Sequence, residues 1–186
     1  MSMISRRVGH VELPLRVRLP RLMPSVQRSM SEVHPKLLAT LRSLVTGNAP
    51  WPLFLYGNVG AGKTLAALCL ADVMRTAVYH TVEDLCSRIL ELRDDHAAVR
   101  ETWEMIAGKN LAILDELGTR QNVSDYHYAT VKRFADAREL HAGRVAIYIS
   151  NLSHAELTKL YDSRIVSRLI CGTRFELKGR DRRVFQ

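Results

Sequence analysis

The stretch from Gly57 to Thr64 constrains the fold of this chain more than any other. It matches the pattern G-x-x-x-x-G-K-[ST] and consists of Gly57, Asn58, Val59, Gly60, Ala61, Gly62, Lys63 and Thr64. In such a loop, small residues let backbone N–H groups surround phosphates at a helix N-terminus, which already favours anions. An apolar segment precedes the loop and an Ala/Leu-rich segment follows it, as the pattern requires. The sequence therefore predicts a nucleotide site in which Lys63 reaches the β- and γ-phosphates and Thr64 ligates Mg²⁺.

Predicted strands and helices alternate along the chain around this loop. Short apolar runs predict strands at 52–56, 77–82, 111–115, 144–150 and 173–177. Helical spacing predicts a helix that ends at Gly47 and further helices at 63–75, 83–93, 96–107, 124–140 and 153–170, the last in one or two pieces. This alternation indicates an α/β fold with a five-stranded, mainly parallel sheet between helices.

The apolar run "LAILD" ends in Asp115 and is followed by Glu116, and these two acidic residues supply a second half for the site. Asp115 falls at the carboxyl end of a predicted buried strand, where α/β sheets bind ligands, and can hold Mg²⁺ through its water shell. Glu116 follows at once and can polarise a water molecule for attack on the γ-phosphate. A plain polar exit from a strand is the alternative for this pair.

The next predicted strand, "AIYIS", ends before Asn151. An amide at that position can hydrogen-bond the γ-phosphate or the attacking water and so report which nucleotide is bound. Alternatively, Asn151 caps the helix that begins near Ser153, which is a common role for asparagine.

Arg164 and Arg168 are four residues apart in "YDSRIVSRL", on one face of a predicted helix. They can be solvated or pair with Asp162. An arginine that reaches the γ-phosphate of a neighbouring subunit would instead stabilise transition-state charge and make hydrolysis depend on assembly.

The net charge of +8 is concentrated at the two ends of the chain. Six Arg and two Glu give residues 1–35 a charge of +4, seven basic and two acidic residues give 164–186 a charge of +5, and the stretch between is −1. A near-neutral body with basic ends suggests contact with DNA or RNA, although some of these arginines can serve nucleotide or a neighbouring subunit. No apolar run reaches the roughly 18–20 residues that cross a bilayer, so we expect no membrane span. The first residues lack the apolar stretch of a secretory signal, and Cys69, Cys86 and Cys171 read as reduced thiols, so we expect a cytoplasmic protein.

The first 35 residues are expected to form a short basic arm ahead of a domain at 36–186. Apolar residues alternate from Val11 to Leu19, a strand period, but Pro14 confines such a segment to a sheet edge or an extended arm. The arm can pack on its own domain or bind a partner.

Three classes of phosphate-loop protein compete for these features. A GTPase is suggested by Asp115-Glu-Leu-Gly118, but the chain contains no N-K-x-D sequence for guanine. A small-molecule kinase fits the length but explains neither Glu116, nor Asn151, nor the basic ends. An ATPase of the additional-strand type explains all of them.

The segments "NLAILDELG", "YISNLSHAELTKLYDSRIVSRL" and "FELKGRDRR" resemble the AAA+ ATPases of the DnaC/IstB group, which are bacterial replicative-helicase loaders and transposition helper ATPases. The resemblance runs from about residue 35 to 183. It implies the following roles: Walker A for Lys63 and Thr64, Walker B for Asp115 and Glu116, sensor 1 for Asn151, arginine finger for Arg168 with Arg164 beside it, and the terminal G-x-x-x-R arginine for Arg183. No helical lid domain is expected after the sheet.

The resemblance further implies an ATP-dependent homo-oligomer that hydrolyses ATP with Mg²⁺ at a subunit interface, stimulated by assembly or DNA. We expect the chain to load a replicative hexameric DNA helicase onto single-stranded DNA. The alternative is a transposition helper that assembles on duplex DNA and recruits a transposase. A third hypothesis is an ATP-binding adaptor with little turnover.

Overall fold

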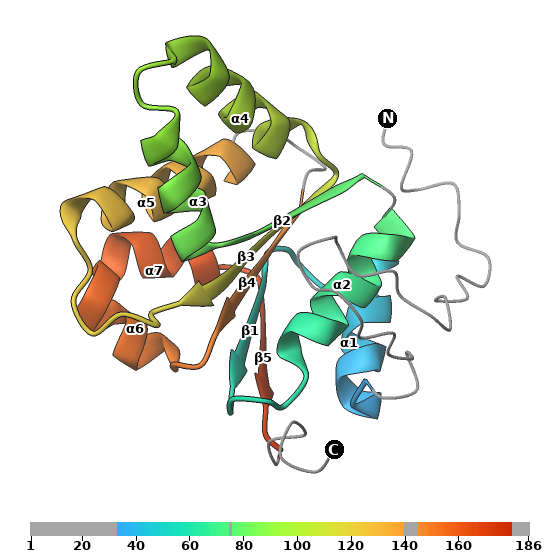
Figure 1. The fold of residues 1–186 in the computed structure, drawn as a ribbon. Helices are drawn as coiled ribbons and strands as arrows, with labels where there is room; N and C mark the ends of the chain where they lie inside the picture. Colours follow the sequence, from blue (N-terminus) through green and yellow to red (C-terminus); the bar gives the residue numbers. More distant parts are fainter. Residues whose placement is uncertain (1–32, 75, 140–144, 180–186) are drawn as a thin grey trace.

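The sheet is the organising element of the fold (Figure 1). The computed structural model describes residues 33–74, 76–139 and 145–179. The strands are β1 (Leu53–Gly57), β2 (Ala77–Thr81), β3 (Leu111–Leu117), β4 (Val145–Ser150) and β5 (Thr173–Leu177). They lie in the order β2-β3-β4-β1-β5, and each neighbouring pair is parallel. The carboxyl ends of all five strands therefore meet at one edge, with β4 between β1 and β3.

Helices cover both faces of the sheet (Figure 1). Two of them, α1 (Pro35–Val45) and α2 (Lys63–Met74), lie on one face. The other face carries α3 (Val82–Glu91), α4 (His96–Gly108), α5 (Asp125–Glu139), α6 (His154–Tyr161) and α7 (Ser163–Ile170). This layering leaves the carboxyl edge of the sheet as the place where loops from several strands converge.

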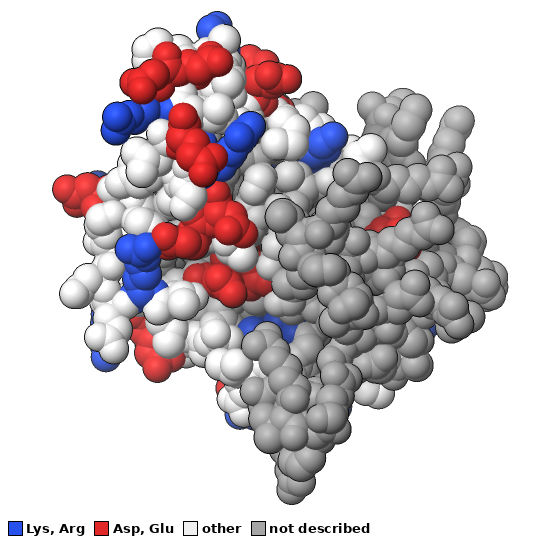
Figure 2. Space-filling model, in the orientation of Figure 1, with Lys and Arg blue, Asp and Glu red and all other residues white. Residues whose placement is uncertain are grey.

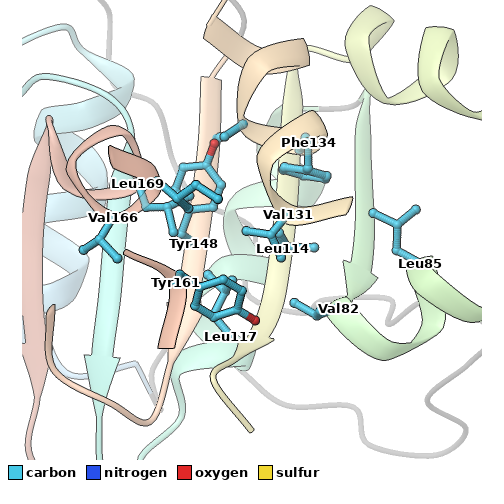
Figure 3. Close-up of a cluster of buried hydrophobic side chains, with 14 of the residues drawn as sticks. Val82, Leu85, Leu114, Leu117, Val131, Phe134, Tyr148, Tyr161, Val166 and Leu169 are labelled. Carbon is cyan, nitrogen blue, oxygen red and sulfur yellow. The ribbon is translucent and has the colours of Figure 1, made fainter. Parts of the chain in front are cut away.

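The side chains of the strands alternate between two apolar clusters. In β1, Leu53 and Leu55 belong to the cluster with α1 and α2, whereas Phe54 belongs to the cluster with the other helices. Figure 3 shows part of the second cluster, where Leu114 and Tyr148 of the sheet lie near Phe134 of α5. Full burial of a large apolar side chain stabilises the fold by about 1.5–3 kcal/mol. Because both faces are covered, the three central strands β1, β3 and β4 consist mostly of apolar residues.

The predicted α/β fold with a five-stranded parallel sheet is confirmed. Most boundaries lie within one or two residues of the prediction. The strand β3 continues to Leu117, so that Glu116 lies within it, and the segment 153–170, predicted as one or two helices, forms two that meet at Asp162, α6 and α7. Asp162 has a φ of 72°, and its Oδ1 accepts hydrogen bonds from the backbone N–H groups of Arg164 and Ile165, so one helix ends where the next begins.

Two predictions fall on residues outside those described: the alternating segment from Val11 to Leu19 and the terminal Arg183. The division into an arm at 1–35 and a domain at 36–186 stays a prediction for the same reason. Within the described ranges, no helix combines the length and apolar character that a membrane crossing needs.

Candidate nucleotide site at the carboxyl edge of the sheet

The phosphate loop connects the end of β1 to the start of α2, and its first residue must be glycine. Gly57 has a φ of 127°, and a Cβ atom there would lie 2.3 Å from the carbonyl oxygen of Leu177 in β5. The loop therefore begins where the backbones of β1 and β5 leave no room for a side chain. It ends at Lys63, the first residue of α2, so that the positive end of the helix dipole faces the loop.

Lys63 lies inside the loop with only 6% of its surface exposed. Its Nζ donates hydrogen bonds to the carbonyl oxygens of Gly57 (2.8 Å) and Asn58 (2.7 Å) and to Oδ1 of Asn151 (2.8 Å). These acceptors hold the ammonium group at the point where phosphate oxygens would arrive. They also join α2 to the residue that follows β4.

Asp115 is 4% exposed and accepts three hydrogen bonds. Its Oδ2 accepts from Thr64 Oγ1 at 2.7 Å and from the Tyr79 hydroxyl at 3.0 Å, while its Oδ1 accepts from the backbone N–H of Glu116 at 2.6 Å. Burial, followed by the charge and the hydrogen bond of Asp115, raises the pKa of Tyr79 far above the usual tyrosine value, so its hydroxyl stays a donor.

The donor set around Asp115 fits Mg²⁺, because this cation prefers oxygen ligands and usually keeps several of its waters. The Thr64 hydroxyl oxygen is available as a direct ligand while its hydrogen points to Asp115. The carboxylate can then accept hydrogen bonds from metal-bound water.

Glu116 occupies an irregular end of β3. Its φ is 62°, unusual for a residue other than glycine, and the pairing of β3 with β4 shifts between Leu114 and Leu117. Its side chain is exposed between the buried Asp115 and Leu117. The irregularity therefore presents two consecutive carboxylates differently, one buried toward Thr64 and the other open to solvent.

Sequence reasoning missed a charged network that shares a pocket of about 180 Å³ with Glu116. Arg120 donates to both carboxylate oxygens of Glu83, and His127 lies 3.3 Å from the same carboxylate through its Nε2. The hydrogen bond from Arg120 is the main cause that lowers the pKa of Glu83. Glu83 and Arg120 are 37 residues apart, so no local sequence pattern predicts that they form a pair.

Asn151 does not cap α6. Ser153 is the cap, because its hydroxyl accepts from the backbone N–H of Glu156 while the Glu156 carboxylate accepts from the backbone N–H of Ser153. This capping box leaves the amide of Asn151 to interact with Lys63.

The two arginines of α7 lie apart from these contacts. Arg168 forms ion pairs with two carboxylates of α5, Asp136 and, at 3.7 Å, Glu139. Arg164 is exposed in the first turn of α7. The structure thus forms two hydrogen-bonded pairs from consecutive residues of α2, Lys63 with Asn151 and Thr64 with Asp115. Glu116 adjoins Asp115, and both arginines lie on another helix.

The parallel sheet of order β2-β3-β4-β1-β5, with the loop from Gly57 to Thr64 after β1, is similar in fold to AAA+ proteins such as the DnaC helicase loader. Among solved structures, the DnaC helicase loader is similar with a TM-score of 0.66 and 20% identity, over 77% of this chain and 89% of that one. DnaI is similar with a TM-score of 0.60 and 21% identity, over 79% of this chain and 82% of that one. The replication initiator DnaA bound to AMPPCP and single-stranded DNA is similar with a TM-score of 0.61 and 20% identity, over 69% of this chain.

The matched part of this chain spans only 40% of that DnaA chain. Neither the protein-family models nor the curated proteins contain a match to the sequence. The predicted similarity to DnaC-type helicase loaders is confirmed at the level of the fold.

Proposed function

We propose that this chain binds ATP with Mg²⁺ and hydrolyses it at the edge where β1, β3 and β4 end. The observation that carries the proposal is a pair of side-chain hydrogen bonds. One links Thr64 to Asp115 in β3, and the other links Lys63 to Asn151, the residue after β4. A simple glycine turn needs neither bond, whereas a nucleotide site needs a cation, a hydroxyl, a carboxylate and an amide together.

Lys63 would bind the β- and γ-phosphates. Three of its acceptors are the backbone carbonyls of Gly57 and Asn58 and the Asn151 amide, and charged phosphate oxygens form stronger hydrogen bonds with an ammonium group than these neutral oxygens do. Once phosphates occupy Lys63, the Asn151 side chain is released to hydrogen-bond the γ-phosphate or the attacking water. Asn151 would thereby distinguish ATP from ADP.

Thr64 and Asp115 would hold Mg²⁺, the latter through water, and the bound metal supplies positive charge against the phosphate oxygens. Glu116 would orient a water molecule and take its proton as the water oxygen bonds to the γ-phosphorus, while the bond from that phosphorus to the β–γ bridging oxygen breaks and ADP leaves. The exposed position of its side chain beside Asp115 supports this role.

Arg168 is proposed to complete the site of a neighbouring subunit in a homo-oligomer, with Arg164 beside it. The Arg168 side chain is 43% exposed, and exposed ion pairs contribute about 0–1 kcal/mol, so its pairing with Asp136 would yield readily to a γ-phosphate. Hydrolysis would then require assembly.

The cellular role that we propose is the loading of a replicative hexameric DNA helicase onto single-stranded DNA. The fold similarity to DnaC and DnaI and the DNA-bound state of the similar DnaA structure support this role. The charge distribution supports it too. Figure 2 shows acidic and basic side chains interspersed on the described part of one face, whereas residues 1–32 hold six Arg against two Glu.

Co-purification with the replicative helicase tests this role. The full chain and its Lys63→Ala variant would be mixed with the helicase and with single- or double-stranded DNA, with and without ATP. The loader function predicts an ATP-dependent ternary complex on single-stranded DNA that Lys63→Ala loses. Failure to bind the helicase, together with ATP-dependent filaments on duplex DNA, would favour the transposition helper instead.

A further inference from the structure

Tyr79 contributes a polar contact to the site from a strand that carries none of the residues assigned to it so far. It lies in β2, one of the two edge strands of the described sheet, in register with Ile113 of β3, two residues before the pair of Thr81 with Asp115. Its ring packs against the apolar cluster of α1 and α2, and its hydroxyl donates to Oδ2 of Asp115 at 3.0 Å. The side chain thus lies on the same face of the sheet as the phosphate-loop helix.

This contact nearly completes the hydrogen bonds that the Asp115 carboxylate can accept. A carboxylate offers about four lone-pair positions, two on each oxygen. Tyr79 and Thr64 occupy Oδ2, and the N–H of Glu116 occupies one position of Oδ1. One position of Oδ1 remains, and its direction is fixed because any rotation of the carboxylate would break one of the three bonds.

We propose that Tyr79 is a positioning residue of the ATPase site, which fixes the Asp115 carboxylate so that its remaining lone pair receives Mg²⁺-bound water. The inference rests on the proposed function. Tyr79 touches neither nucleotide nor metal in this assignment; it acts through Asp115. Its effect is therefore on the metal dependence of the site, whereas the phosphate loop itself does not need it.

The variant Tyr79→Phe separates these two effects, because it keeps the ring and its packing and removes only the hydroxyl. Tyr126→Phe is a matched control, since the Tyr126 hydroxyl donates at the same distance of 3.0 Å but to the carbonyl oxygen of Cys86, away from the loop. The binding of a fluorescent, non-hydrolysable ATP analogue would be titrated with Mg²⁺ for each protein, in parallel with steady-state ATP hydrolysis.

We expect Tyr79→Phe to raise the Mg²⁺ concentration for half-maximal binding and hydrolysis at least about tenfold, because a hydrogen bond to a charged group is lost. Binding of the analogue in EDTA should stay within about twofold of wild type, and Tyr126→Phe should match wild type throughout. A general disturbance of the fold would lower the affinity in EDTA as well.

Suppose that the wild-type protein shows Mg²⁺-dependent binding and hydrolysis. If Tyr79→Phe then reaches half-maximal binding at an unchanged or lower Mg²⁺ concentration, the role of Tyr79 alone is overturned. A loss of affinity for the analogue in EDTA equal to the loss in Mg²⁺ would also overturn it. Absence of nucleotide binding and hydrolysis in the wild-type protein would overturn the proposed function and this inference together.

Discussion

Substituting Gly57 by alanine tests whether the close approach of β1 to β5 shapes the phosphate loop. The new Cβ would lie 2.3 Å from the Leu177 carbonyl oxygen, which is 1.1 Å short of the 3.4 Å at which ordinary contact begins. The obstacle is backbone, so the two strands must separate where Gly57 pairs with Leu177. Alanine must also adopt a φ near 127°, which is a conformation that L side chains rarely adopt.

The cost of this substitution has two parts. Strained backbone at a single residue costs about 1–3 kcal/mol, and each ladder hydrogen bond lost as the strands part costs about 0.5–1.5 kcal/mol. A total of roughly 3–4 kcal/mol in a chain of this size lowers Tm by about 6–16 °C, since 1 kcal/mol corresponds to about 2–4 °C. Nucleotide affinity should fall too, because the displaced carbonyl of Gly57 is an acceptor for Lys63.

Gly47→Ala is the matched control. Gly47 also has a positive φ, 77°, but a Cβ there meets nothing within 4 Å, so this variant carries backbone strain without a clash. It should lower Tm by only about 2–8 °C, for about 1–2 kcal/mol of strain, and leave nucleotide binding unchanged. Calorimetry and titration with a fluorescent ATP analogue measure both quantities. Equal Tm values and equal affinities for the two variants would refute the reasoning.

Two further predictions concern catalysis. Arg168→Ala should abolish most ATP hydrolysis while ATP binding persists. Mixing this variant with Lys63→Ala protein should restore part of the activity, because a mixed interface can combine an intact loop with an intact arginine. A fully active Arg168→Ala protein would rule out Arg168 as an arginine finger. Asn151→Ala should lower the hydrolysis rate at saturating ATP at least about tenfold, since one hydrogen bond to the γ-phosphate or to the attacking water is lost. Single-turnover measurements give this rate, and a wild-type rate in Asn151→Ala would remove Asn151 from the mechanism.

The five strands of the parallel sheet and the central candidate site residues could be predicted from the sequence because their signals are local. A loop pattern lies between an apolar run and a helix, and each later polar residue follows an apolar run. Asp115 and Asn151 reach the loop because β4 pairs with β1 and β3 pairs with β4, an order that the structure supplies. The choice between cap and sensor for Asn151 needed the structure, which shows Ser153 as the cap.

Contacts between distant segments could not be predicted in the same way. Tyr79 reads only as an apolar strand residue, and its contact with Asp115 depends on the register of β2 with β3. The ion pair of Glu83 with Arg120 and the pairing of Arg168 with the α5 carboxylates also join residues that are far apart in the sequence. The positive φ of Glu116 is a property of the irregular β3–β4 pairing, which the apolar pattern of β3 does not reveal.

Steady-state hydrolysis and equilibrium binding of ATP by Glu116→Gln test the central claim most directly, with Lys63→Ala as the comparison. Glutamine keeps the size of the side chain but cannot take a proton from water. We predict wild-type ATP affinity with at least about 100-fold slower hydrolysis in Glu116→Gln, as expected on loss of a general base, and loss of tight binding in Lys63→Ala. Wild-type turnover in Glu116→Gln would contradict the account.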